Sequence, residues 1–184
     1  MRNTVRLPAV LLALALVHVT AHRAGAAGSL TGVDAMTSTI MQHDQTSFSG
    51  LAARLRLEPG PKGLEILPGI EYWRTTTKVP IYDIHSQRRD ATLSADVRYR
   101  FPTTGWSPYL GAGFGIHFLS SEVQAPLLGV PGESHSIMKG GLAVLGGLNF
   151  PLATAFESFL EAKYHAVSDN EQLKLNWGLA YTFH

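Results

Sequence analysis

The sequence predicts an all-β protein built as one eight-stranded antiparallel up-and-down barrel, and three observations lead to this prediction. First, residues 173–183 place an apolar residue at every second position, with polar or small residues between them. Successive side chains of a strand point to opposite faces, so this is a two-faced strand. Second, the same alternation recurs in segments of about ten residues between turn signals. Third, residue 28 is followed by little helical periodicity and by no apolar run of about 18 residues.

Eight segments show the alternation, and the first of them is the weakest. They cover residues 30–41, 48–57, 64–76, 91–101, 108–119, 137–150, 156–167 and 173–183. The connections differ in length. Short turns with Pro, Gly or Thr are expected at 59–63, 102–107 and 151–154, whereas 77–90 and 120–136 are long and polar. Short turns at one rim and longer loops at the other are typical of bacterial outer-membrane barrels, with the short turns on the periplasmic side. The two long connections would carry partner recognition, or alternatively extend the barrel as hairpins.

Residues 1–26 are predicted to be a secretory signal peptide, which leaves 27–184 as one barrel domain. Arg2 and Arg6 form a positive start, an apolar run follows, and the small residues at 24–26 suit cleavage. The apolar run is too short to cross a bilayer, which takes about 20 residues. The chain has no cysteine, so no disulfide framework supports the exported fold.

The charge balance argues against a nucleic-acid partner. The formal net charge is +1, from 15 Lys and Arg against 14 Asp and Glu. Cleavage would remove Arg2, Arg6 and Arg23, which changes the balance to −2. A nucleic-acid-binding domain would instead carry a basic patch.

Lipid is expected on the apolar face of the strands, because the other face does not suit bulk water. A soluble eight-stranded barrel, such as a lipocalin, also alternates, with its apolar side inward and a solvated outer face. Here the polar face is rich in glycine, as at Gly111, Gly113 and Gly115, and carries charges of both signs. Small residues and opposite charges suit a narrow interior. Aromatic residues at the ends of the apolar face, such as Tyr99 and Tyr181, are typical of membrane interfaces.

With these features the chain resembles the small eight-stranded bacterial outer-membrane barrels, the OmpA-like and OmpX-like group also described as porin-family β-barrel domains. Residues 67–72, 108–115, 160–165 and 175–183 carry the resemblance, which covers the whole mature chain. The resemblance implies an outer-membrane location in a Gram-negative bacterium, with assembly by the outer-membrane machinery. It also implies contact with outer-membrane lipid and lipopolysaccharide. Such barrels usually end on an aromatic residue, whereas here His184 follows Phe183.

The polar face is predicted to form a network of ion pairs and hydrogen bonds inside the barrel, because desolvated charges are costly unless they are paired. The predicted members are Arg54, Arg56, Glu71, Asp96, Arg98, Arg100, Glu157, Glu161, Lys163, His165 and Lys174. This network would largely plug the lumen. The protein is therefore expected to be a monomer with a structural or surface-interaction role through its extracellular loops, with a partner that the sequence does not identify. The alternative is a narrow channel for small polar solutes or ions.

No catalytic, cofactor or metal site is expected. Some small outer-membrane barrels modify lipid A, and lipid A deacylases, as a family, carry His and Ser two residues apart on one strand face. In this chain His165 and Ser168 are three apart, so they would point to opposite faces. The histidines outside the signal peptide show no metal-ligand spacing.

Arg88 and Arg89, in one of the long loops, suit contacts with lipopolysaccharide phosphates.

Overall fold

The computed structural model describes residues 29–42, 47–79, 84–125, 130–168 and 170–183. The predicted signal peptide lies outside the described residues, as do 80–83 and 126–129 in the two longest connections. In the ranges described, no helix is long and apolar enough to cross a membrane.

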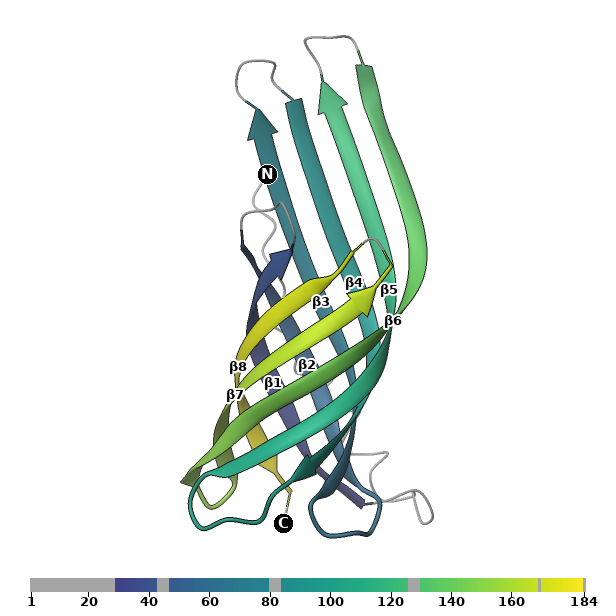
Figure 1. Ribbon diagram of the computed structural model, residues 1–184. Helices are drawn as coiled ribbons and strands as arrows, with labels where there is room; N and C mark the ends of the chain where they lie inside the picture. Colours follow the sequence, from purple (N-terminus) through teal and green to yellow (C-terminus); the bar gives the residue numbers. More distant parts are fainter. Residues whose placement is uncertain (1–28, 43–46, 80–83, 126–129, 169, 184) are drawn as a thin grey trace.

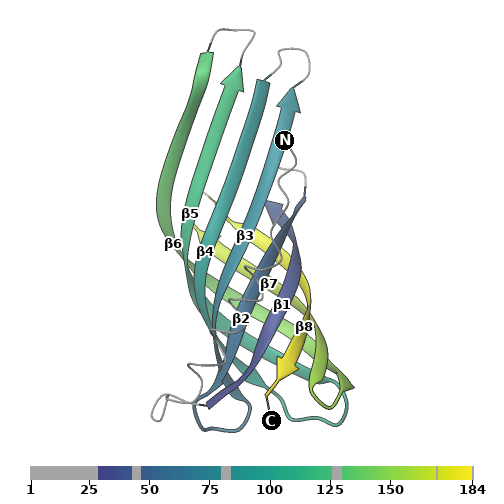
Figure 2. The ribbon, with the colours of Figure 1, turned by 180° about the vertical axis from the view of Figure 1, so that it is seen from behind.

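Eight antiparallel strands form a closed barrel, so the predicted fold class is confirmed. Each strand pairs with its neighbour in sequence, and β1 pairs with β8 from Gly32 opposite Thr182 to Gln42 opposite Gln172, which closes the sheet (Figures 1 and 2). The strands are β1 (Ser29–Gln42), β2 (Phe48–Glu58), β3 (Leu64–Val79), β4 (Ile84–Arg100), β5 (Ser107–Ala125), β6 (Val130–Ala153), β7 (Phe156–Val167) and β8 (Gln172–Thr182).

The apolar face of the strands points outward, as the sequence predicts. Along β8, Leu173, Leu175 and Trp177 are exposed, whereas Lys174 and Asn176 are buried. The same alternation of exposed apolar and buried polar residues runs from Asp90 to Tyr99 of β4 and from Leu160 to Ala166 of β7. Because the outward Trp177 exposes 56% of its surface and Leu51 exposes 67%, the barrel wall carries a broad apolar belt. Such a belt is stable only against lipid, and a closed barrel satisfies every backbone group of the sheet within it.

Short turns join the strands at the rim where both described ends of the chain lie. Gly63, in the turn between β2 and β3, has a φ of 87°, which L side chains rarely adopt. A Cβ there would lie 2.6 Å from the Arg100 carbonyl oxygen. The close approach lets the Arg100 amide donate a hydrogen bond to the Gly63 carbonyl at 2.7 Å, which ties this turn to the end of β4. The turn predicted at 151–154 is shorter than expected, because β6 continues to Ala153 with a bulge after Pro151.

The prediction that residues 77–90 and 120–136 are loops is wrong, and the hairpin alternative is confirmed. β3 continues to Val79 and β4 begins at Ile84, while β5 continues to Ala125 and β6 begins at Val130. These four strands rise well beyond the others and form a tall wall on one side of the barrel mouth (Figures 1 and 2). We call this wall, formed by residues 74–79, 84–89, 120–125 and 130–136, the projecting sheet.

The projecting sheet has two open edges. The register between β2 and β3 ends at Gly50 opposite Trp73, and the register between β6 and β7 begins only at Gly141 opposite Val167. Above these pairs, β3 and β6 have no neighbour on their outer side among the described residues. The extension lacked a clear sequence signal because both faces of a sheet above the membrane meet water, so its strands need no apolar alternation.

Candidate functional site: the charged lumen

All eleven residues predicted for the interior lie on the inward face of the barrel. Eight of them are buried: Arg54, Arg56, Asp96, Arg98, Glu161, Lys163, His165 and Lys174. The other three, Glu71, Arg100 and Glu157, are partly buried. Strand alternation sends every second side chain of each strand into the lumen, where an eight-stranded barrel leaves just enough room for side chains.

At the short-turn end, two carboxylates each bind two arginines. Glu157 accepts hydrogen bonds from Arg56 at 2.7 Å and from Arg100 at 2.9 Å. Glu65 pairs with Arg98 at 2.5 Å and with Arg100 at 2.8 Å. Arg100 thus bridges the two acids, and the cluster joins strands β2, β3, β4 and β7 across the barrel.

In the middle of the lumen, Arg54 and Glu161 form the central ion pair. The Arg54 guanidinium donates to both carboxylate oxygens of Glu161, at 3.0 and 2.9 Å, and to Asp34 at 3.2 Å. Glu161 also accepts hydrogen bonds from Tyr109 at 3.0 Å and from Asn176 at 2.9 Å. Asp34 in turn accepts from Arg56 at 2.5 Å, which connects this layer to the short-turn end.

Glycines on the inner wall make room for the large side chains of this layer. The Tyr109 side chain lies against Gly147 of the next strand, where an added Cβ would come within 2.5 Å of the hydroxyl oxygen and 2.3 Å of the Leu160 carbonyl oxygen. The glycine-rich inner face that the sequence showed is therefore a packing requirement of a filled interior.

Toward the long-hairpin end, Lys163 lies between two carboxylates. Its Nζ donates to Glu71 at 2.8 Å and to Asp96 at 2.8 Å. Lys174 also pairs with Glu71. A second charge layer of alternating sign therefore sits above the Arg54–Glu161 pair.

A cluster of neutral and acidic groups follows at the top of the lumen. The Asp90 carboxylate accepts a hydrogen bond from His117 Nδ1 at 2.8 Å and from the Thr92 hydroxyl at 3.1 Å. A hydrogen bond of 3.1 Å joins His117 Nε2 to His165 Nδ1. Gln172 reaches Asp90 from β8 at 3.4 Å, so the cluster spans strands β4, β5, β7 and β8.

The sequence prediction missed several members of these layers. Asp90 was assigned to a loop, but it is fully buried in the lumen because β4 begins six residues earlier. Asp34 lies in the weakest predicted strand, where Met36 and Ile40 share the inward face and blur the alternation. Glu65 was recoverable, because it lies two residues before Leu67 on the inward face of β3.

The arrangement does not gather a hydrolytic site around His165 and Ser168. His165 is buried in the lumen against His117, whereas Ser168 is exposed beyond the end of β7. Asp90, His117 and Thr92 do combine a carboxylate, an imidazole and a hydroxyl, but all three are buried. Over the described part of the chain, no group of three or more acidic or histidine side chains is arranged to hold a metal ion.

Comparison with known proteins supports the same architecture. No protein-family model matches the chain. No curated protein matches it in sequence either. Among solved structures, the chain is similar to Ail, the attachment invasion locus protein of Yersinia pestis, with 18% identity, a TM-score of 0.57, and coverage of 84% of this chain and 97% of that one.

Two further structures have the same fold. Neisserial surface protein A has 17% identity and a TM-score of 0.59, over 83% of this chain and 96% of that chain. A major outer membrane protein from Thermus thermophilus has 16% identity and a TM-score of 0.61, over 83% of this chain and 99% of that chain. The exposed apolar belt and this shared architecture together support the outer-membrane location that the sequence predicts. The chain therefore shares its fold, a closed antiparallel barrel of eight strands, with Ail and neisserial surface protein A.

Proposed function

We propose that the protein is a monomeric, non-enzymatic outer-membrane barrel with a lumen closed by side chains, and that it acts at the cell surface through the projecting sheet. The observation that carries this proposal is the height of the sheet and its two open edges. An open edge offers a row of backbone donors and acceptors to an added strand. All eight strands pair within one chain, so the barrel closes without a second copy.

The ion-paired lumen favours the surface role over the channel alternative. Layers of paired charge run from Glu157 at one end to Asp90 at the other, and most of their members are buried. A solute would have to separate buried pairs such as Arg54–Glu161, and an uncompensated buried charge is costly. Eight strands also leave no room for an aqueous channel of the kind found in barrels of about 16 strands.

Planar-bilayer recording tests the closed lumen. The purified barrel should add no discrete conductance steps above the bilayer baseline. A double variant, Arg54→Ala with Glu161→Ala, removes the central pair and serves as the comparison, because truncating both side chains should open a conducting path. Discrete steps from the wild-type protein would instead establish the narrow channel.

A shortened variant tests the surface role. Replacing residues 75–88 and 121–135 by Asn-Gly turns, which suit two-residue hairpin connections, removes most of both open edges. It leaves only Arg74 of β3 and residues 136–140 of β6 without an outer neighbour, and it keeps the barrel pairing below. Its folding can be checked by heat-modifiable gel mobility.

Two probes suit the comparison. One is a set of strand-forming peptides, which an open edge would bind. The other is immobilised heparin with sucrose octasulfate as competitor, chosen because the structure of Ail was determined in complex with that heparin analogue. The full-length barrel in nanodiscs should bind at least one probe, and the shortened variant should not. Equal binding by both proteins, or no binding of either probe, would refute the assignment.

A further inference from the structure

Two arginines face each other on the outer side of the barrel wall. Arg74 of β3 and Arg89 of β4 are direct cross-strand partners, and both are exposed. Like charges directly opposite each other destabilise a sheet. Arg74 donates a hydrogen bond to Gln87 at 2.5 Å, but neither arginine forms an ion pair with a carboxylate of the described chain. Such a pair would be stabilised by an external anion.

Of the two adjacent arginines that the sequence suggested for lipopolysaccharide phosphates, only Arg89 lies on this outer face. Arg88 and Arg89 are neighbours in one strand, and neighbouring residues of a strand point to opposite faces. Asp90 points inward, so Arg89 points outward. Arg88 then points to the same side as Asp90, the face that overlooks the barrel mouth. The companion of Arg89 on the outer face is Arg74.

The arginine pair lies at the upper border of the apolar belt. The next outward residues below it are Tyr72 on β3 and Ala91 on β4, which pair with each other. On the neighbouring strand the outward face changes at the same level, from Phe118 to Ser120, and Ser120 is in register with Arg89. A lipid whose acyl chains cover the belt would therefore hold its phosphate at the height of Arg74 and Arg89.

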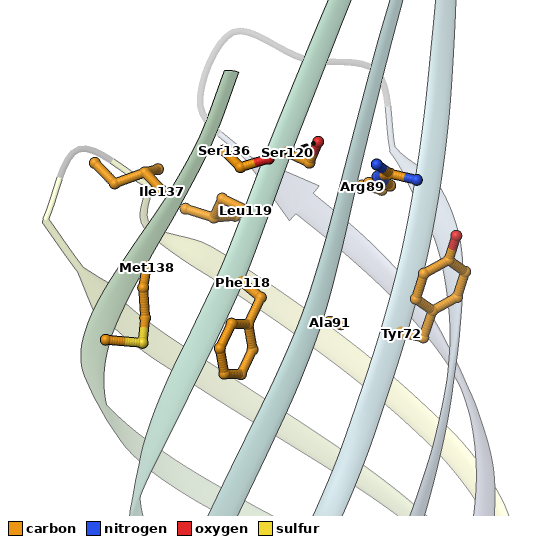
Figure 3. A pocket seen from close by; sticks show the side chains of 9 residues that line it. All are labelled: Tyr72, Arg89, Ala91, Phe118, Leu119, Ser120, Ser136, Ile137 and Met138. Atoms are coloured by element: carbon orange, nitrogen blue, oxygen red, sulfur yellow. Dashed lines mark hydrogen bonds between the residues drawn. The ribbon is translucent and has the colours of Figure 1, made fainter. Parts of the chain in front are cut away.

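A groove lies directly beside the arginine pair. It has a volume of about 510 Å³, and Figure 3 shows Arg89 and the Tyr72 hydroxyl at one side of it, with Phe118 and Met138 below. Ser120 and Ser136 line its upper part, and the hydroxyl of Ser136 donates to that of Ser120 at 3.3 Å. The groove thus has a polar upper end, which fits a sugar, and an apolar lower end.

A second, almost entirely apolar groove continues along the barrel wall. It has a volume of about 680 Å³ and shares Tyr72, Ala91 and Phe118 with the first. The hollow forms because Ala35, Ala53 and Ala91 carry small side chains beside the larger side chains of Leu51 and Ile70. A hollow of this kind on a lipid-facing wall fits an acyl chain.

We propose that Arg74, Arg89 and the two grooves form a binding site for the lipid A part of lipopolysaccharide. The arginines bind a phosphate of the lipid, Ser120 and Ser136 face its sugar, and one acyl chain runs down over Ala91. Arginine suits this role because its planar guanidinium can bind phosphate through two hydrogen bonds. Lipid A combines phosphate, sugar and several acyl chains, which matches a polar end and an apolar groove better than a glycerophospholipid does. The proposal rests on the outer-membrane location in the proposed function, but not on any partner of the projecting sheet.

The test measures binding of bisphosphorylated lipid A to the folded barrel in detergent by native mass spectrometry. The double variant Arg74→Gln with Arg89→Gln should bind about tenfold more weakly or worse, because hydrogen bonds to a charged group are lost. Arg88→Gln is the matched control, with the same change one residue away on the opposite face, and it should bind like the wild type. Ala91→Leu fills the junction of the two grooves and should also weaken binding, with both arginines intact. Gel mobility confirms folding of each variant.

Two outcomes would overturn the site. One is wild-type affinity of the Arg74→Gln, Arg89→Gln variant, and the other is an equal loss in Arg88→Gln. Phosphatidylglycerol bound as tightly as lipid A would overturn the choice of lipid A as the occupant. The shortened variant keeps both arginines, so it should bind lipid A normally, which separates a failure of this site from a failure of the projecting sheet.

Discussion

Replacing Glu161 by Gln tests whether the charges in the lumen are desolvated. The Glu161 carboxylate accepts hydrogen bonds from Arg54, Tyr109 and Asn176. Gln keeps nearly the same shape but removes the negative charge, and its amide nitrogen cannot accept a hydrogen bond. Arg54 would keep Asp34, at 3.2 Å, as its remaining close partner.

The structure sets the size of the expected loss. Breaking a buried ion pair by removing one partner costs about 3–5 kcal/mol of the free energy of unfolding. Because Arg54 retains Asp34, the loss from Glu161→Gln should lie at the lower end, about 3 kcal/mol. Glu58→Gln is the matched control, since Glu58 is exposed at the end of β2 and its change should stay within about 0.5 kcal/mol.

Urea unfolding of the barrel in lipid vesicles measures this loss, with tryptophan fluorescence as the signal and gel mobility as the check for folded protein. The double variant Glu161→Gln with Arg54→Met should recover much of the stability, because the buried arginine that has lost its main partner is removed as well. A Glu161→Gln variant as stable as Glu58→Gln would refute the reasoning. It would mean that water screens the pair, and a wet lumen would also weaken the case for a closed barrel.

Two further changes test the faces of the wall. Leu175→Arg places a charge on the lipid-facing side of β8 and should cost about 2–4 kcal/mol in the same urea assay, whereas Glu171→Arg, at the end of that face, should cost about 1 kcal/mol or less. Equal effects would mean that the outer face is not in lipid. Gly147→Ala should lower stability by about 1–3 kcal/mol because its Cβ would meet Tyr109. Gly140→Ala, whose Cβ would lie 3.4 Å from its nearest neighbour, should be tolerated. Similar losses for both glycines would contradict a tightly filled lumen.

The barrel was predictable from sequence because lipid outside and charge inside impose a two-residue period on each membrane-spanning strand. That period identified the inward side of β4, β7 and β8, including Lys163 and Lys174. It also gave the correct direction for the apolar face. The pairing of particular charges was not predictable. Arg54 and Glu161, for example, are 107 residues apart in the sequence, and only the closed barrel brings their side chains together.

The sequence did not reveal the parts of the structure in which alternating apolar and polar residues would not stabilise the fold. In the projecting sheet both faces meet water, so residues such as Thr75 and Ser121 give no alternation, although they lie in regular strands. Inside the barrel, apolar residues such as Met36 and Phe159 pack together on the inward side and obscure the polar pattern of their strands. The arginine pair was missed for a related reason, since Arg74 and Arg89 become neighbours only through the register of β3 with β4.

The pairing of β1 with β8 has a consequence for how the barrel assembles. Most neighbouring strands come together through short segments of chain, as where Ala125 meets Val130 between β5 and β6. The seam instead joins Gly32 to Thr182, so it is closed only by bringing the two ends of the domain together. Contacts between residues far apart in sequence form late, because the entropy of the intervening chain must be lost first. The β1–β8 pairing should therefore be the last strand pairing to form during insertion.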